Sequence, residues 1–327
     1  SLSLARAFRA VRHCGSTERA FAERANTLWI PGAESETMFG PMSHQPPHAP
    51  TSDPAHASAS HADAHHGEPP AAAPARAPTW KRAIVVGASS GIGAALVREL
   101  AAAGTDVVAI ARRAEQLGEL ARSCAGSRGR VHVLAHDVAR FDDAAPAFER
   151  ALAELGGLDL IVYAAGAMRE VGANEFDTAK DLDMLAVNVG GCVAWLNPAA
   201  NFLRTQRSGT LVGISSIAGE RGRKGNPVYG ATKAAMNHYL EALRNRLADW
   251  NVHVCTIKPG FVETPMLAQA RAQGRTIKGA ISAEECARSI LAAARARKNE
   301  VFVPFKWRLV GFVIRNIPSF LFKGMNI

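Results

Sequence analysis

The sequence predicts an α/β fold with a doubly wound, seven-stranded parallel sheet. From residue 80 onward, short apolar runs rich in β-branched residues alternate with longer segments whose apolar residues recur at helical spacing. Strands buried on both faces of a parallel sheet read as continuous apolar runs of this kind. A glycine-rich turn joins the first strand to the first helix. Right-handed crossovers then place all strand carboxyl ends at one edge, where ligands bind.

Each element follows from its own local signals. The first strand ends in a glycine, and the helix after it begins near Ile92 and ends near Gly104. The long helix 227–250 has a proline at its start, where the missing N–H is tolerated. Pro198 is expected to break or kink the helix 182–203. We expect strands at 81–87, 106–111, 131–134, 158–164, 210–215, 252–257 and 301–303, and helices at 92–100, 113–122, 148–155, 182–203, 227–250 and 283–296.

Composition limits the class of protein. The chain has 327 residues, 48% of them hydrophobic, which is enough for a sizeable core. It lacks the run of about 18 apolar residues that a spanning helix needs. The net charge of +9 suits several anionic ligands, but aromatics are only 6% and no nucleic-acid-binding motif is present, so we expect no nucleic-acid partner. Five scattered cysteines indicate reduced thiols, a cytoplasmic location and no metal site: Cys14, Cys124, Cys192, Cys255 and Cys286.

The chain divides into three segments. Residues 1–79 are expected to be disordered, because 42–79 consists mainly of Pro, Ala, Ser and His and cannot bury enough apolar surface. Residues 4–12 could form a short helix. For the six histidines between residues 44 and 66, metal binding is the alternative to a compositionally biased linker, and we favour the linker. Residues 80–304 form the single folded domain. Residues 305–327 are an apolar extension that carries four basic side chains.

The glycine turn is the first candidate binding element. It reads Gly87-Ala88-Ser89-Ser90-Gly91-Ile92-Gly93, between a strand and a helix. Glycines let the backbone approach a ligand closely, and the helix start attracts phosphate. A tight turn without a ligand is the alternative interpretation.

The end of the second strand indicates which cofactor binds. An acidic residue there would bind the adenosine ribose hydroxyls, but this chain has Ala111 followed by Arg112 and Arg113. Arginine binds phosphate as a planar fork, so the pair suits a 2′-phosphate. We therefore expect NADP(H) rather than NAD(H).

Tyr229 and Lys233 are the candidate catalytic pair. They stand at i and i+4 on one helix, so both face the same side, and a nearby ammonium lowers the pKa of a phenol. Ser216 follows the strand 210–215, where a hydroxyl can bind the substrate oxygen. Ser215 is the competing candidate. Side chains alternate along a strand, so at most one of the two serines should face the site.

Together these motifs resemble the short-chain dehydrogenase/reductase family, in its compact branch of roughly 250-residue enzymes. The resemblance covers residues 80 to about 304. The serine thirteen residues before the tyrosine is typical of the family, so the resemblance favours Ser216. In place of the family's usual Asn-Asn-Ala-Gly, this chain has Tyr163-Ala164-Ala165-Gly166, where we expect Tyr163 to pack in the core. The matching segments are 87–93, Asp137-Val138, Asn188, 214–216, 229–233 and 259–264.

The resemblance implies a role for each matching residue. Ser216, Tyr229, Lys233 and Asn188 would be catalytic, with Tyr229 as general acid/base and Asn188 holding a water in a proton relay. Lys233 would also bind the nicotinamide ribose, and Asp137 would accept from the adenine amino group, unless it only caps the chain locally. Cofactor-binding residues would be Gly87, Ser89, Ser90, Gly91, Ile92, Gly93, Arg112, Arg113, Asp137, Val138, Ala165, Gly166, Tyr229, Lys233, Pro259, Gly260, Val262 and Thr264.

The sequence thus predicts a cytoplasmic NADP(H)-dependent oxidoreductase that acts on a ketone or alcohol, as a homodimer or homotetramer. The segment 266–281 is expected to form a mobile lid. The extension 305–327 would pack on a subunit or the core, or lie in a membrane interface, which would suit a hydrophobic, lipid-like substrate. A nucleotide-sensing or membrane-peripheral protein with secondary or no catalysis is the alternative.

Overall fold

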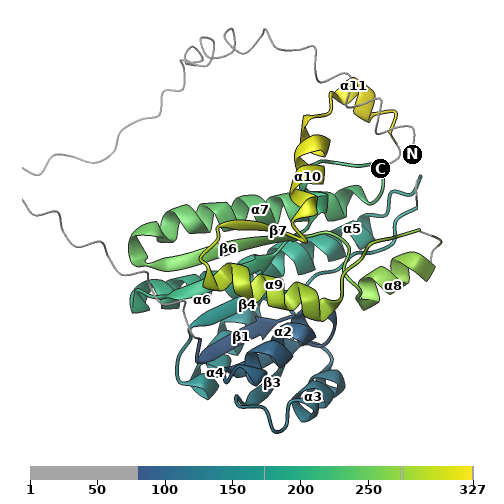
Figure 1. Cartoon of the computed structure of the whole chain (residues 1–327). Helices are drawn as coiled ribbons and strands as arrows, with labels where there is room; N and C mark the ends of the chain where they lie inside the picture. Colours follow the sequence, from purple (N-terminus) through teal and green to yellow (C-terminus); the bar gives the residue numbers. More distant parts are fainter. Residues whose placement is uncertain (1–79, 173, 273, 275, 326–327) are drawn as a thin grey trace, which may run out of the picture. The chain divides into compact units, whose positions relative to one another are not determined.

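A computed structural model describes residues 80–172, 174–272, 274 and 276–325. Seven parallel strands form one sheet in the order β3-β2-β1-β4-β5-β6-β7 (Figure 1), which confirms the predicted Rossmann-like fold. The order reverses between β1 and β4, the kind of position where open α/β sheets bind ligands. The strands are β1 (Arg82–Val86), β2 (Asp106–Ala111), β3 (Val131–Ala135), β4 (Leu160–Tyr163), β5 (Gly209–Ile214), β6 (Val252–Pro259) and β7 (Glu300–Val303).

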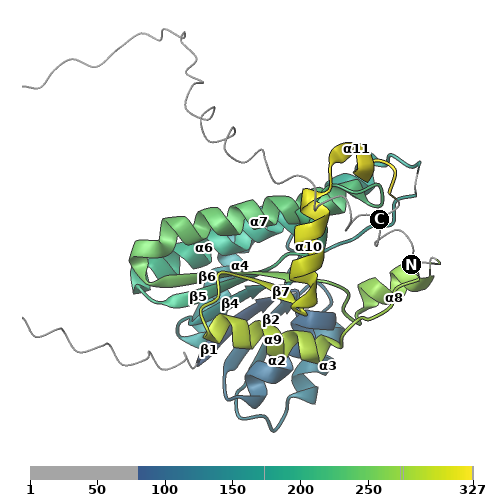
Figure 2. The same cartoon turned by 45° about the horizontal axis from the view of Figure 1, so that its top comes forward.

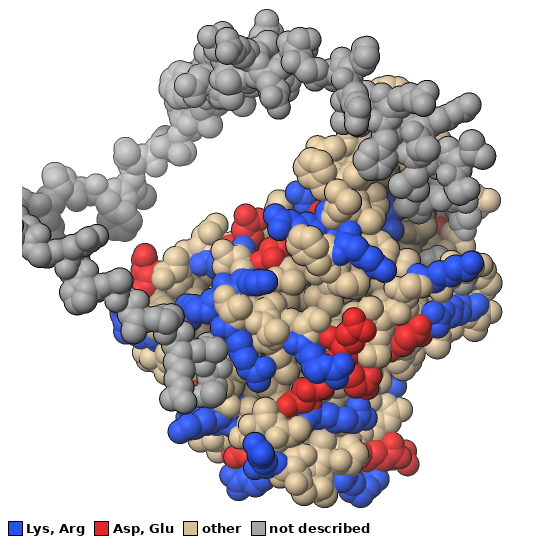
Figure 3. All heavy atoms as spheres, in the orientation of Figure 1, with Lys and Arg blue, Asp and Glu red and all other residues tan. Residues whose placement is uncertain are grey.

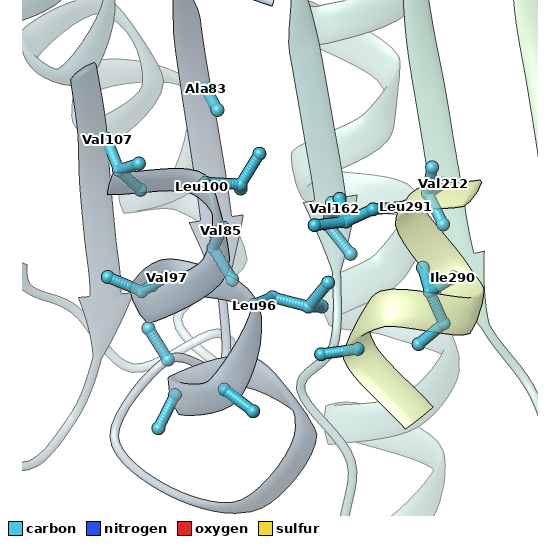
Figure 4. Close-up of a cluster of buried hydrophobic side chains, with 14 of the residues drawn as sticks. Ala83, Val85, Leu96, Val97, Leu100, Val107, Val162, Val212, Ile290 and Leu291 are labelled. Carbon is cyan, nitrogen blue, oxygen red and sulfur yellow. The ribbon is translucent and has the colours of Figure 1, made fainter. Parts of the chain in front are cut away.

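Helices cover both faces of the sheet and make two hydrophobic cores. One face is covered by α2 (Gly91–Ala102), α3 (Ala114–Ser123) and α9 (Ala283–Arg295), as the close-up of α2 and α9 over the strands shows (Figure 4). The other face is covered by α4 (Ala144–Leu155), α6 (Gly191–Gln206) and α7 (Pro227–Leu247). Figure 2 shows α7 and α6 on the side of the sheet opposite α9. The central strands are buried on both faces, so they could be recognised as continuous apolar runs.

The helix predicted at 182–203 differs in three ways. It begins earlier, as α5 (Thr178–Leu185), and Asp177 caps it by accepting from the Lys180 amide at 3.1 Å. A π-helical segment, η3 (Ala186–Gly190), separates α5 from α6. Pro198 lies inside α6, so the expected break there was wrong. The helix predicted at 227–250 is α7 up to Leu247, followed by a short 3₁₀ turn.

The last part of the chain is helical. Helices α10 (Lys306–Asn316) and α11 (Ser319–Phe322) make up the apolar extension. Helix α8 (Pro265–Ala272) lies in the predicted lid segment. Earlier in the chain, the short 3₁₀ turn η4 (Ile217–Glu220) follows β5. In the part of the chain that the structure describes, no helix is long and apolar enough to cross a bilayer. Cys124, Cys192, Cys255 and Cys286 are free thiols. The tail 1–79, with its histidines, its expected helix and Cys14, lies outside the described residues.

Candidate active site

The glycine turn packs against the segment that follows β4. Gly87 has φ +90°, and a Cβ there would clash with the backbone of Ala165. A Cβ on Gly93 would clash with the carbonyl of Gly87. Ser90 is the N-cap of α2 but makes no side-chain cap, and no acidic residue lies in the first turn. The uncapped N–H groups of this helix start therefore fit a phosphate group.

Arg113 and Arg112 leave the end of β2 in different directions. The guanidinium of Arg113 donates to Ser89 Oγ at 2.7 Å and to Ser90 Oγ at 2.9 Å, so it lies beside the glycine turn. Arg112 is 57% exposed and faces Asp137, with 3.7 Å between Nη1 and Oδ2. The glycine turn itself contains no basic residue, but Arg113, which follows β2, lies beside it. Both arginines thus border the region where the adenosine end of a dinucleotide would fit.

A hollow of about 610 Å³ opens beside Arg112 at the end of β3 and is lined by His136 and Asp137. His136 is buried, and burial lowers its pKa. Asp137 Oδ1 accepts from the Ala139 amide at 3.1 Å, so the carboxylate serves as a local cap, the alternative noted above. Its other oxygen faces Arg112. Val138 is buried next to it. Asp137, which was expected at the adenine, therefore lies just after β3, beside an open space, with Val138 next to it.

Helix α7 carries Tyr229 and Lys233 one turn apart. Asn226 caps the helix, with its Oδ1 accepting from the Tyr229 amide at 3.2 Å, and Pro227 occupies the first turn. The Lys233 Nζ lies 5.8 Å from the centre of the Tyr229 ring and donates to the Ile214 carbonyl at 3.0 Å. The phenol and the ammonium therefore share one face of the helix, beside the end of β5.

The protein environment shifts the pKa of both groups. Burial raises the pKa of Tyr229, while a hydrogen bond with Ser216 and the charge of Arg223 act in the opposite direction. Burial lowers the pKa of Lys233 to about 8. The lowered pKa that the sequence predicts for Tyr229 is not found in this structure, because the loss of solvent outweighs the favourable contacts.

The two serines after β5 have different partners. Ser215 donates to the carbonyl of Lys233 at 3.0 Å, so its hydroxyl is directed to the backbone of α7. Ser216 is the N-cap of η4, where its hydroxyl accepts from the Ala218 amide at 3.1 Å, and it is close enough to Tyr229 to lower the pKa of that phenol, against the larger effect of burial. This arrangement favours Ser216 over Ser215 as the serine that meets a substrate.

Asn188 lies in the π-helical segment η3 and is fully buried. Its amide group donates to the Ala167 carbonyl and to the Thr232 hydroxyl, both at 2.9 Å, and its Oδ1 accepts from the Ala167 amide at 2.7 Å. A Cβ on Gly166 would lie 3.6 Å from both Asn188 Oδ1 and Lys233 Nζ. Asn188 and Lys233 therefore border the same small residue, although Asn188 is also satisfied by backbone.

The loop after β6 returns over the glycine turn. The Gly260 amide donates to the Val303 carbonyl at 2.9 Å, and Val262 bridges to Ile281. The Thr264 hydroxyl donates to the Val262 carbonyl at 3.2 Å, and its methyl group is what a Cβ on Gly91 would meet, at 2.9 Å. The predicted nicotinamide loop, which begins with Pro259 at the end of β6, thus meets the turn predicted to bind phosphate.

The remaining predicted residues lie around these groups. Ile92 is half-buried at the start of α2 and packs against the core. Ala165 contacts the glycine turn, as described above. Tyr163 is fully buried, and its hydroxyl donates to the Val187 carbonyl at 2.5 Å, so it is a core residue, as predicted.

Three residues at the site were not anticipated from the sequence. Thr232 links Asn188 to α7, because its hydroxyl accepts from Asn188 and donates to the Tyr229 carbonyl at 2.7 Å. Asn226 holds the helix start at φ +56°. Trp307, from α10, packs edge-on against Phe261 at 5.3 Å and covers Gly260. Of these, only Asn226 carries a local signal, as an N-cap residue before a proline.

This sheet order, with a glycine turn open to phosphate and a serine, a tyrosine and a lysine gathered at the strand ends, is typical of dinucleotide-dependent oxidoreductases. The family model described as short chain dehydrogenase matches residues 81–275. The chain therefore belongs to the short-chain dehydrogenase/reductase family and is an oxidoreductase of that family.

Relatives and solved structures agree with this assignment. An uncharacterized oxidoreductase of Staphylococcus aureus strain USA300 is 31% identical over 221 residues, which are 68% of this chain and 94% of the relative. One of Myxococcus xanthus strain DK1622 is 35% identical over 58% of this chain and 75% of the relative. A short-chain type dehydrogenase/reductase from Mycobacterium ulcerans has a similar fold, with a TM-score of 0.63 and 23% identity over 75% of this chain and 98% of that structure. ElxO with NADP bound has a TM-score of 0.64 and 20% identity, covering 70% of this chain and 99% of that structure.

Proposed function

We propose that the protein transfers a hydride between NADP(H) and a ketone, aldehyde or alcohol. The observation that supports this most directly is the gathering of three groups beside the end of β5: Ser216, Tyr229 and the buried ammonium of Lys233, which lies 5.8 Å from the centre of the Tyr229 ring. Two hydroxyls side by side can hold one carbonyl oxygen between them. When bound, the nicotinamide supplies or accepts the hydride.

Residues of this chain would donate and accept the proton that accompanies the hydride. During reduction, the phenol of Tyr229 gives its proton to the carbonyl oxygen as that oxygen gains charge, and Ser216 donates a hydrogen bond to the same oxygen. Lys233 has a pKa of about 8, so it can exchange protons close to neutral pH. Its ammonium and the Asn188 oxygen border Gly166, which supports a proton relay in which a water held by Asn188 passes a proton to Lys233.

The adenosine end supports NADP(H) over NAD(H). Arg113 lies beside the glycine turn, Arg112 faces Asp137, and Ala111 stands where an acidic residue would bind ribose hydroxyls. The similar fold of ElxO was solved with NADP bound, which agrees with this preference for the present chain.

Substitution of Tyr229 tests the chemistry. We expect Tyr229→Phe to lower turnover by about 10²–10⁴-fold in a screen of ketones and alcohols, while NADPH binding followed by fluorescence is retained. Tyr239→Phe is the matched control, because Tyr239 lies on the same helix but its hydroxyl contacts Asn197 at 2.8 Å, away from the site. Normal turnover of Tyr229→Phe would refute the mechanism, and NADPH binding by the wild type without turnover of any substrate would favour a nucleotide sensor.

The two arginines test the cofactor preference. We expect Arg112→Ala and Arg113→Ala each to raise the KM for NADPH by about tenfold or more and the KM for NADH much less, because only the 2′-phosphate loses a charged partner. An equal rise for both cofactors would remove the support for a 2′-phosphate contact. Arg128→Ala, at an exposed arginine near the far end of the strands, is the control.

A further inference from the structure

Helices α10 and α11 present a large apolar face to solvent. Eleven large apolar side chains are exposed among the described residues, and six of them fall within residues 305–321. Phe305, Leu309 and Phe312 are 73%, 65% and 67% exposed and lie four and three residues apart, so they share one side of α10. Phe320 and Leu321 on α11 are 76% and 48% exposed. Both views show these helices projecting beyond the sheet (Figures 1 and 2). Contiguous apolar surface of this kind marks an interaction site.

The opposite side of α10 is packed on the domain, so the outer face is held in a defined orientation. Gly311 is buried, and a Cβ there would meet Ile217 of η4 at 2.9 Å and Phe302 of β7 at 3.2 Å. Trp307 packs on the loop after β6 by its edge-on contact with Phe261. Helix α10 is therefore packed on the domain along one side, while its outer side is exposed.

Polar contacts also fix the end of α10. The Arg221 guanidinium donates to the Ile314 carbonyl at 2.9 Å and stacks on the Phe322 ring at 4.1 Å, so it joins both helices to the segment after η4. Arg315 pairs with Glu220, whose other oxygen lies 2.7 Å from the buried ammonium of Lys258. These contacts tie the two helices to the sheet.

The charges carried by the apolar extension itself are of one sign. Residues 305–327 contain two lysines, two arginines and no acidic residue, so they contribute +4 to the net charge of +9. Arg315 is paired with Glu220, while Lys306, Arg308 and Lys323 are exposed. In the space-filling view, basic side chains border the apolar surface in the region of α10 (Figure 3). A second copy of this chain would bring two such positive faces together, which disfavours self-association through this face.

We propose that α10 and α11 bind the surface of a membrane that contains anionic lipids. The apolar side chains enter the headgroup region, and the lysines and arginines contact the lipid phosphates and carboxylates. With 11 and four residues, the helices are too short to span a bilayer but long enough to lie along its surface. The proposal does not depend on the proposed enzymatic activity, because it concerns only this face.

Vesicle flotation of the full-length protein tests the proposal. We expect the wild type to float with vesicles of phosphatidylcholine and phosphatidylserine, and to float much less with phosphatidylcholine alone or at high salt. The triple variant Phe305→Glu, Leu309→Glu, Phe312→Glu should lose binding by roughly tenfold or more. Phe176→Glu is the matched control, because Phe176 is 94% exposed and belongs to neither helix.

Two measurements keep the outcome decisive. Thermal unfolding should show that the triple variant folds as the wild type does, since all three replaced side chains point into solvent. If the variant floats as well as the wild type, or if the wild type does not bind anionic vesicles, the proposal is overturned. If sedimentation shows only that the wild type is an oligomer and the triple variant is a smaller species, the face binds a second copy and the proposal is likewise overturned.

Discussion

The burial of the Lys233 ammonium leads to a prediction about the pH dependence of stability, which can be tested without cofactor or substrate. Lys233 is only 4% exposed, and burial lowers its pKa from 10.5 to about 8. Each pKa unit corresponds to about 1.4 kcal/mol, so the shift of about 2.5 units is equivalent to about 3 kcal/mol. Below pH 8 the lysine is charged in both the folded and unfolded states, and the fold bears this whole cost.

The sign of the pH dependence follows from proton binding. Between pH 8 and pH 10.5 the unfolded chain keeps the proton of Lys233 while the folded chain has released it. Stability rises with pH wherever the unfolded state binds more protons. Lys233→Met has no group to titrate there, so the free energy of unfolding of the wild type should gain up to about 3 kcal/mol relative to the variant across this window.

Urea unfolding of both proteins at a series of pH values measures this difference. Other groups that titrate in the same range are present in both proteins and cancel, except for Cys192, whose pKa depends in part on the charge of Lys233. The lost hydrogen bond from Lys233 to the Ile214 carbonyl adds an offset that does not depend on pH. Lys298→Met, at an exposed lysine, is the matched control. A difference between wild type and Lys233→Met that stays constant with pH would refute a buried, titrating ammonium.

Three further substitutions test the framework around the site. Gly87→Ala should destabilise the fold by about 2 kcal/mol or more in denaturant unfolding, because Gly87 has φ +90° and no room for a Cβ, whereas Gly126→Ala, with φ +93° but open space, should show only the smaller cost of the backbone conformation. Thr232→Val should lower kcat with little change in KM, because Asn188 loses its link to α7; an unchanged kcat would make that link irrelevant to turnover. Tyr163→Phe should cost about 1 kcal/mol of stability, because it removes a buried hydrogen bond to the Val187 carbonyl, and should leave kcat unchanged, which steady-state kinetics would check.

Much of the fold could be predicted because its signals are local. The central strands of the sheet are buried on both faces, so their apolar runs identify them without knowledge of their neighbours. The π-helical segment around Asn188 could not be predicted, because it accompanies hydrogen bonds from that amide to Ala167 and Thr232, which are distant in sequence. Pro198 was expected to break or kink the helix 182–203, but α6 continues through it without a break.

At the site, the sequence located the groups but not their contacts. Ser216, Tyr229 and Lys233 could be grouped because strand ends and helix spacing place them on one edge. The position of Arg113 beside the glycine turn depends on the path of the chain after β2, and the pKa of Tyr229 depends on burial that only the packed structure reveals. The packing of α10 depends on Arg221, more than 90 residues earlier, which no local pattern indicates.

The carboxylate of Glu220 pairs with two cations, the buried Lys258 on β6 and Arg315 on α10. It lies four residues after Ser216, at the end of the same short turn. Any force that lifts α10 from the domain therefore removes one of its partners and leaves Lys258 to hold it alone. A displacement of α10 would therefore change the ion pairing beside the turn that begins at Ser216.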